Sequence, residues 1–508
     1  MPATMRFLLP AALLTLPFTA LADAPFSRGP YPQMPTTSGA TIVWRTRGVM
    51  LPEVRVGTSA RKLDTVYNID RIPARRTLAD GPSTEGHAPL FAAPPGTTQF
   101  EAELTGLLPD TKYYYGIYDA GKLLTPGDGT CTFNTLPEPG KERPCTFWVV
   151  GDSGTATNSQ RDVHKAFLKW REKSRTPVDF YMHVGDMAYT KGMDTEFQMG
   201  FFDIYGETLR GLTCWPAMGN HEGGTSKGKT GIGPYYDCYV CPKFGESGGT
   251  ASGLEAYYSW DFGRTHFICL DSHDLSRSAT GPMAQWLKSD LEKTKADWII
   301  AYWHHPPYTK GSHDSDKEKD LIEMRENIMP IAEAGGVDLV LTGHSHIYER
   351  SFLMNGAYTT PTVAENAVLD DRSGDPGGQG PYHKRPGNLP HDGTLQIVAG
   401  HGGQALSRKD HPHPVMRRSI TEWGSVIVTV DGNKLTALML NSEGKERDEV
   451  QIVKDAKSPP VRIARPRKPE PAEGPKKNRS KDQKPDPKGE EDDKPADPDA
   501  PPAATTKS

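Results

Sequence analysis

The sequence predicts an α/β layered domain preceded by an all-β domain, and two observations carry that prediction. From about residue 40 to residue 135, short β-rich runs such as 40–46 (ATIVWRT) alternate with turn residues, without helical periodicity between them. From residue 146 onward, short apolar runs such as 146–151 (TFWVVG) alternate with helical patterns instead. That alternation is typical of a sheet covered by helices.

The strands and helices of the second domain follow one another in a regular order. Apolar runs at 179–185, 213–219, 265–271, 297–304 and 337–343 predict buried strands, and 394–400 and 425–440 are expected to return as strands. Helical patterns at 162–171, 283–294 and 322–334 lie between some of them. Residues 355–392 form a polar, Gly/Pro-rich insertion to which the sequence assigns no role.

Both ends of the chain differ in composition from the middle. Arg6, an apolar run over 7–21 and the Ala20-Leu21-Ala22 site predict a cleaved signal peptide over 1–22, hence a secreted or periplasmic product. No later run reaches the ~18–20 apolar residues of a membrane span. Residues 455–508 are rich in Pro and charge and poor in aromatic residues, which predicts a disordered tail that acts as a spacer or as a surface-associating segment.

Charge and cysteine content narrow the function classes. Lys and Arg number 59 against 64 Asp and Glu, a net charge of -5, which disfavours nucleic acid as the main partner but allows a small phosphate ester. Six cysteines in an oxidising compartment predict one to three disulfides of unknown pairing. For the C-x-x-C pair Cys238/Cys241 we favour a structural disulfide over redox or zinc chemistry.

Polar residues that could bind metal follow the ends of five predicted strands. They are Asp152 in GDSG, Asp186 and Tyr189 in GDMAY, Asn220 and His221 in GNHE, His304 in AYWHHP, and His344 and His346 in GHSH. Each alone could be an ordinary turn residue. Ligands bind outside the carboxyl ends of strands in α/β sheets, so we expect these groups to meet at one rim. Their oxygen and imidazole donors suit two metal ions that activate water and hold phosphoryl oxygens.

The ordered motifs GDxG, GDxxY, GNH-Asp/Glu, VxxH (AYWH at 301–304) and GHxH, with HIYER at 346–350, resemble those of the calcineurin-like metallophosphoesterases and, among them, the purple acid phosphatases. Ala301 departs from the Val of the family motif. The resemblance implies a metallophosphoesterase domain with a β-sandwich core over 141–454. Residues 100–121 resemble the E–F region of a fibronectin type III domain, so we expect a fibronectin type III-like domain over 23–140.

The resemblance also implies roles for individual side chains. Asp152, Asp186, Tyr189 and His346 would hold a ferric ion, and Asp186 would bridge to a divalent zinc, manganese or iron ion held by Asn220, His304 and His344. His221 and His313 are expected to be catalytic and to contact the substrate phosphate, with His221 protonating the leaving group. His305 is expected to contact substrate as well, although His305 and His313 could instead be exposed loop residues.

We therefore expect a phosphatase that hydrolyses small phosphate monoesters by attack of a metal-bound hydroxide. Two other interpretations stay open. One is a phosphodiesterase or nucleotidase with the same metal site, and the other is a binding protein whose catalytic domain has lost activity. The sequence does not indicate an oligomeric state.

Overall fold

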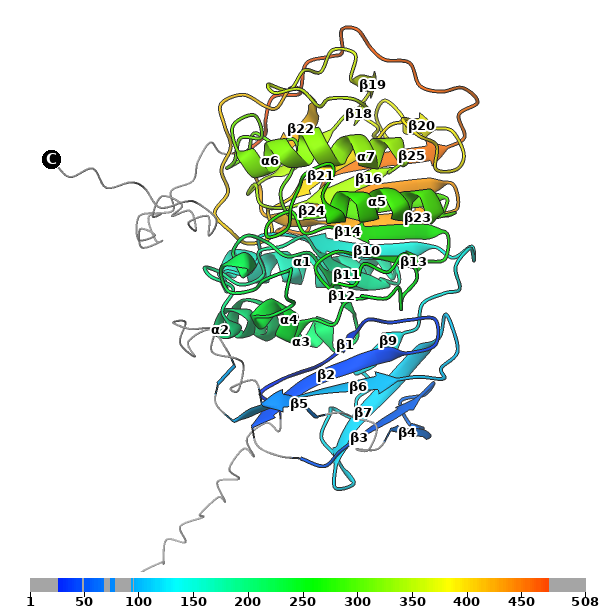
Figure 1. Cartoon of the computed structure of the whole chain (residues 1–508), viewed down its shortest axis with the longest axis vertical. Helices are drawn as coiled ribbons and strands as arrows, with labels where there is room; N and C mark the ends of the chain where they lie inside the picture. Colours follow the sequence, from blue (N-terminus) through cyan, green and yellow to red (C-terminus); the bar gives the residue numbers. More distant parts are fainter. Residues whose placement is uncertain (1–25, 48–49, 68–73, 78–92, 95, 475–508) are drawn as a thin grey trace, which may run out of the picture.

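The computed structural model describes residues 26–47, 50–67, 74–77, 93–94 and 96–474. The predicted signal peptide and the end of the predicted tail, 475–508, lie outside these residues. Figure 1 shows an all-β region at the N-terminal side and a larger layered domain of strands and helices beside it. The predicted fold class is confirmed.

The N-terminal region is a pair of antiparallel sheets around an apolar core of its own. Ile42, Trp44, Val54 and Ile117 are among the buried residues of that core. One sheet has the order β1(Arg28–Gln33), β2(Ala40–Arg47), β6(Thr97–Leu104), β5(Ala74–Thr77), and the other β4(Thr65–Tyr67), β3(Pro52–Gly57), β7(Lys112–Asp119), β8(Lys122–Leu123), with β9(Thr132–Asn134) also paired to β7. The likeness to fibronectin type III domains stays a prediction.

Two seven-stranded sheets form the centre of the larger domain. The first has the order β12(Cys214–Pro216), β11(Phe180–His183), β10(Cys145–Val150), β23(Gly424–Asp431), β24(Lys434–Asn441), β25(Glu446–Lys454), β20(Tyr382–Lys384). The second has the order β13(Tyr258–Phe262), β14(Thr265–Cys269), β15(Trp298–Tyr302), β16(Leu339–Thr342), β21(Leu395–Ala399), β17(Tyr348–Ser351), β22(Met416–Ile420). A short pair, β18(Leu353–Met354) and β19(Val368–Asp370), completes the strands.

The two sheets pack face to face through aromatic side chains, and helices cover their outer faces. Phe147 of β10 meets Phe267 of β14 edge to face at 5.5 Å between ring centroids. Its neighbour Trp148 points to the opposite face, where it stacks on Phe167 of α1(Asn158–Ser174) at 4.1 Å. Successive residues of a strand face opposite sides, so one buried strand serves both layers. The predicted α/β domain with a β-sandwich core is therefore present.

The remaining helices are short. They are α2(Asp194–Phe197), α3(Asp203–Leu209), α4(Pro234–Cys238), α5(Pro282–Lys293), α6(Lys319–Glu323) and α7(Met329–Ala334). Single π-turns at 198–202 and 324–328 join α2 to α3 and α6 to α7. The helical patterns predicted around 162–171, 283–294 and 322–334 coincide with α1, α5 and the α6–α7 segment. In Figure 1, α5, α6 and α7 lie over the second sheet.

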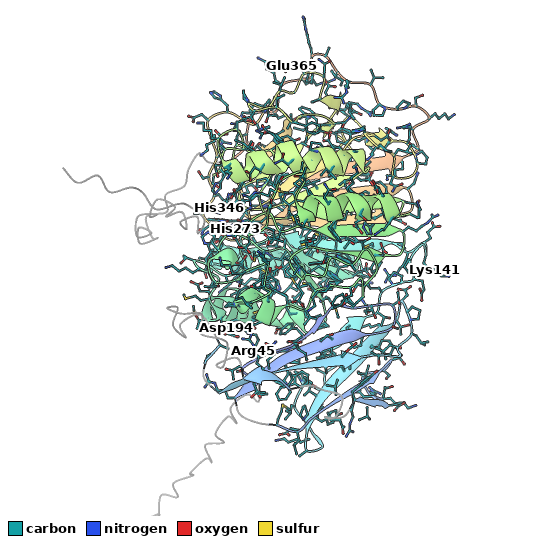
Figure 2. All side chains as sticks on the ribbon, viewed as in Figure 1. Arg45, Lys141, Asp194, His273, His346 and Glu365 are labelled. Carbon is teal, nitrogen blue, oxygen red and sulfur yellow. The ribbon has the colours of Figure 1, made fainter. Side chains whose placement is uncertain are left out.

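A buried ion cluster joins the two domains. Asp194 at the start of α2 accepts from Arg28 at 3.1 Å and from Arg45 at 2.5 Å, and all three side chains are at most 5% exposed. Arg28 also lies over the ring of Phe202 at 4.4 Å. Figure 2 shows Arg45 and Asp194 where the all-β region meets the larger domain. The N-terminal domain is thus held to the larger domain by two guanidinium groups that share one carboxylate.

The expectation of disulfides is wrong in this structure. All six cysteines lie within the described residues, are buried and are free thiols. Cys238 accepts from the Arg28 guanidinium at 3.0 Å, whereas Cys241 lies beside Cys269 and Tyr258. The two sulfurs of the C-x-x-C pair therefore face different surroundings, and sequence proximity does not bring them into bonding geometry.

Part of the predicted disordered tail lies against the larger domain. Glu473 pairs with Arg418 of β22 at 2.8 Å and with Arg447 of β25 at 3.2 Å. Its backbone donates to Ser419 at 2.9 Å, and Ile463 donates to the Val368 carbonyl at 2.8 Å. Residues 455–474 consequently belong to the folded structure, which corrects the predicted start of the tail. The 355–392 insertion likewise contributes β19 and β20.

Candidate metal centre

The predicted ligands meet at the carboxyl ends of the central strands. Asp152 follows β10, Asp186 follows β11, Asn220 follows β12, His304 follows β15, and His344 and His346 follow β16. Strands β10–β11–β12 run parallel, as do β14–β15–β16–β21, so these ends lie on the same side of their sheets. The rim predicted from sequence is the place where these side chains gather.

Four of the predicted ligands surround one point. The Tyr189 hydroxyl lies 3.1 Å from Asp186 Oδ2 and 3.4 Å from Asp152 Oδ1. His346 Nε2 lies 3.6 Å from the same Asp152 oxygen. Asp152 and Asp186 are at most 1% exposed. These are the four residues that we assigned to the ferric ion, although the assignment itself stays a prediction.

The other predicted ligands surround a second point next to the first. The Asn220 side-chain oxygen lies 2.9 Å from His304 Nε2 and 3.0 Å from His344 Nδ1. His304 Nε2 is also 3.4 Å from Asp186 Oδ2. Asp186 therefore touches both groups, which is the position that a bridging carboxylate would need.

The backbone at this rim is strained in a repeated way. Asp152, Asp186 and His344 have φ values of 54°, 60° and 64°, in the left-handed region that residues with a Cβ rarely adopt. Such residues cost of order 1–3 kcal/mol each and persist where surrounding structure holds them, often at functional sites. Gly185 directly precedes Asp186. A glycine is needed there because a Cβ at this position would lie 2.4 Å from His304 Nδ1.

Glu222 is a site residue that the sequence analysis did not assign. Its side chain is fully buried and accepts four backbone N–H groups, those of Asp186 (2.8 Å), Met187 (2.8 Å), Ala188 (3.0 Å) and Gly219 (2.9 Å). It thus ties the loop after β11 to the loop after β12. The signal was its place in the GNHE motif, directly after His221, but only the fold reveals what it contacts.

The charges at the rim suit bound cations. Burial raises the pKa of Asp152 well above its usual range, whereas His304 and His221 outweigh burial at Asp186 and hold its pKa well below that range. Among the described residues, neither carboxylate forms an ion pair with Lys or Arg. Buried carboxylates are stable when paired or when they coordinate metals. Carboxylate, carboxamide, phenol and imidazole donors fit first-row transition-metal ions.

The three predicted substrate histidines differ in access. His221 is 30% exposed, and its Nδ1 donates to the Thr190 carbonyl at 2.7 Å. His313 is 31% exposed and stacks on His344 at 3.8 Å between centroids. His305 is only 2% exposed. His221 and His313 can therefore face a substrate, and His305 is shielded from open solvent.

Glu318 is a second site residue outside the sequence prediction. Its carboxylate accepts from His313 Nδ1 at 2.7 Å and lies 3.8 Å from His344 Nε2. Contacts with these histidines lower the pKa of Glu318, against the opposing effect of burial. Glu318 precedes α6 and fixes the orientation of a histidine that faces the opening.

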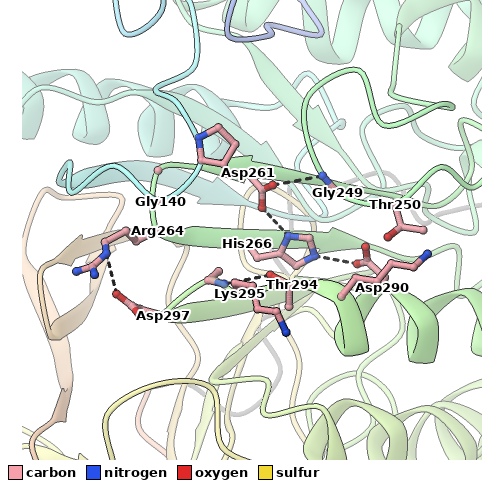
Figure 3. Close-up of a pocket in the computed structure, with 14 residues that line it drawn as sticks. Gly140, Gly249, Thr250, Asp261, Arg264, His266, Asp290, Thr294, Lys295 and Asp297 are labelled. Atoms are coloured by element: carbon pink, nitrogen blue, oxygen red, sulfur yellow. Dashed lines mark hydrogen bonds and ion pairs between the residues drawn. The ribbon is translucent and has the colours of Figure 1, made fainter.

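The cavity drawn in Figure 3 lies away from the predicted ligands. It has a volume of about 450 Å³ and is lined by Gly140, Gly249, Arg264, Lys295 and Asp297, among others, but by none of the predicted ligands. At its side, His266 is buried between Asp261 at 2.7 Å and Asp290 at 2.8 Å. Burial would lower the pKa of His266, but these two carboxylates raise it to about 9. This imidazolium joins β13, β14 and α5 and is fully paired.

Residues 145–348 match the family described as calcineurin-like phosphoesterases. Over this segment the chain is similar to calcineurin-like metallophosphoesterase domains. Relatives include Purple acid phosphatase 18 of Arabidopsis thaliana, 28% identical over 54% of this chain and 64% of that protein, and Purple acid phosphatase 23 of the same plant, 30% identical over 50% and 57%. The chain spans about half to two thirds of the length of these relatives.

Two solved structures share the fold of this chain. Purple acid phosphatase PPD1 from yellow lupin (Lupinus luteus) seeds superposes with a TM-score of 0.61 at 17% identity, over 84% of this chain and 75% of that one. PhoD superposes with a TM-score of 0.56 at 13% identity, over 89% and 94%. Among the described residues, no helix has the length and apolarity to cross a bilayer.

Proposed function

We propose that the protein is a secreted phosphatase that hydrolyses small phosphate monoesters at a two-metal site. The observation that carries the proposal is that Asp186 contacts both groups of donors, 3.1 Å from the Tyr189 hydroxyl and 3.4 Å from His304 Nε2. Ferric iron would lie with Asp152, Tyr189 and His346. A divalent zinc, manganese or iron ion would lie with the remaining three ligands.

When bound, two metal ions would supply an activated water and neutralise charge on the phosphoryl oxygens. The protein's own contribution at the opening is His221. A carbonyl oxygen only accepts, so the bond to Thr190 keeps the proton on Nδ1 and turns Nε2 toward the rim, 3.8 Å from Asp186. In its doubly protonated form, a ring held in this way carries a second proton on Nε2, which it can pass to the departing alcohol oxygen.

His313 is placed to contact the substrate from the other side of the rim. The Glu318 carboxylate accepts from Nδ1, so the doubly protonated ring can donate from the opposite nitrogen to a phosphate oxygen. The stacking against His344 fixes the plane of the ring. His221 and His313 would thus flank the phosphoryl group, while the N-terminal strands, which we interpret as fibronectin type III-like, lie outside the site.

The test uses the purified full chain, with hydrolysis of an aryl phosphomonoester and of the matching diester measured on one sample. Metal analysis and a visible spectrum of that sample accompany the assay. We expect monoester turnover, two metals at the rim, and a visible phenolate-to-iron band that Tyr189→Phe abolishes. Asp186→Ala should remove activity, and retention of full activity would refute the proposed mechanism. Diester preference without colour would favour the phosphodiesterase interpretation, and an inactive protein free of metal would favour the binding protein.

A further inference from the structure

Three potential metal ligands gather beside the predicted centre but belong to neither of its donor groups. They are His273, in the loop after β14, His305, directly after the predicted ligand His304, and Asp320, in α6. One ligand atom from each lies within 4.8 Å of the others. Figure 2 labels His273 close to His346, at the same edge of the domain. Three separate segments of the chain thus converge on one small volume.

His305 is oriented as metal-binding histidines usually are. Its Nδ1 lies 2.9 Å from Ser272 Oγ, which also accepts from the His305 backbone at 3.0 Å. A hydrogen bond at one ring nitrogen fixes the ring and leaves the other nitrogen to bind a metal. The ring lies 4.4 Å from that of His344 and 6.0 Å from that of His273. His305 therefore separates the predicted divalent site from the new group.

One ring nitrogen of His273 has no hydrogen-bond partner in the part of the chain that the structure describes. Its Nδ1 is buried without a hydrogen-bond partner among the described residues. The ring fits only because residue 223 is glycine, since a Cβ there would lie 2.0 Å from His273 Cδ2. An orphaned buried nitrogen is unfavourable unless something binds it.

Arg277 holds Asp320 and the loop that carries His273 in place. Its Nη2 pairs with Asp320 Oδ1 at 2.6 Å and its Nε with Glu323 at 3.0 Å. Its Nη1 donates to the carbonyls of Ser272 (2.9 Å) and His273 (3.0 Å). The two carboxylates carry one negative charge more than the guanidinium neutralises, and a carboxylate has oxygen lone pairs to spare for a second partner.

We propose that His273, His305 and Asp320 form a third metal site, for a divalent transition-metal ion of the zinc type. Two imidazoles and one carboxylate, with an open position for water, are a donor set that Zn²⁺ takes in proteins. The site goes beyond the two-metal proposal and does not depend on it. It also gives His305 a role different from the substrate contact that we expected from sequence.

The experiment counts metal rather than activity. The full chain is stripped with a chelator, reloaded with Zn²⁺, dialysed and analysed for zinc per chain by mass spectrometry. The wild type is compared with His273→Ala and with Asp320→Asn, both of which leave the predicted two-metal ligands in place. The matched controls are His383→Ala and Asp297→Asn, which change a histidine and an aspartate in surface ion pairs. Circular dichroism in chelator checks that all variants fold alike.

We expect each site variant to bind one zinc ion fewer than the wild type, and each control to bind the same number. Ser272→Ala should leave the count unchanged at saturation but weaken the affinity for that ion about 10–100-fold, because it removes the partner of His305 Nδ1. Equal zinc counts in the wild type and both site variants would overturn the proposal. The difference of one ion is measurable whether the neighbouring centre binds two ions or fewer, so failure of the phosphatase proposal would be seen separately.

Discussion

Glu222→Gln is the change that we expect to separate the scaffold of the metal centre from its ligands. Glu222 Oε2 accepts from the backbone of Asp186 and Gly219, and Oε1 accepts from Met187 and Ala188. Glutamine is of similar size but offers one oxygen and an amide that only donates. Two of the four hydrogen bonds would therefore be lost, and two buried N–H groups would face another donor.

The magnitude follows from those two bonds. A hydrogen bond to a charged group contributes about 1.5–3 kcal/mol, so the loss amounts to about 3–6 kcal/mol. The lost energy lowers metal affinity to the extent that it destabilises the loop conformation that binds metal. At 1.4 kcal/mol per factor of ten, the lower value of about 3 kcal/mol then corresponds to a loss in metal affinity of about 100-fold. Asp186 and Asn220 themselves are unchanged, so the ligand set remains complete.

The assay is a competition of the reloaded protein against a chelator, read as metal retained per chain, with thermal unfolding measured in parallel. Glu207→Gln, an exposed carboxylate on α3, is the matched control and should retain metal as the wild type does. If Glu222→Gln keeps its metal with an affinity within about threefold of the wild type, the idea that Glu222 positions the two loops is refuted.

Three further outcomes follow from other parts of the structure. Asp194→Asn leaves Arg28 and Arg45 buried without their shared carboxylate and should cost about 3–5 kcal/mol in chemical unfolding; a loss below about 1 kcal/mol would contradict the role of this cluster. Because the pKa of His266 is raised to about 9 when folded, against ~6.5 unfolded, its stabilisation should be complete below pH ~6.5 and decline as pH rises through about 9. Unfolding at pH 6 and pH 10 should differ by about 3 kcal/mol more in the wild type than in His266→Gln, and an equal difference would exclude this linkage. Removal of metal by chelation should lower the melting temperature and reloading should restore it, since an ion at 1,000 times its Kd stabilises by about 4 kcal/mol; an unchanged melting temperature in calorimetry would argue against buried ions.

Much of the candidate site was predictable because its residues follow their strands directly. Asp152, Asp186 and His344 each come one residue after a glycine that ends an apolar run, so sequence position alone places them at a rim. Glu222 belongs to the GNHE motif, but the sequence did not predict its role, since its four partners are backbone N–H groups on two loops. His273 and Asp320 lie in segments without a motif and become neighbours only through the fold.

The errors at the level of the fold have similar physical reasons. Composition predicted disorder from residue 455, but Glu473 forms ion pairs with Arg418 and Arg447 and adds a backbone bridge to β22. A few specific pairs can hold a segment whose average composition is that of a linker. The spacing of Cys238 and Cys241 showed nearness along the chain, whereas bonding depends on where each sulfur points.

The six buried thiols allow local unfolding to be followed through their reactivity, because a buried thiol reacts only when the structure around it opens. Each cysteine is at most 2% exposed, and they are distributed from β9's neighbour Cys131 to Cys269 at the end of β14. A thiol reagent added to the folded protein would find little to modify, and each sulfur should react when its own layer opens. Mass spectrometry of partly labelled protein would then show in which order the N-terminal sheets, the first central sheet and the second central sheet open, without any engineered label.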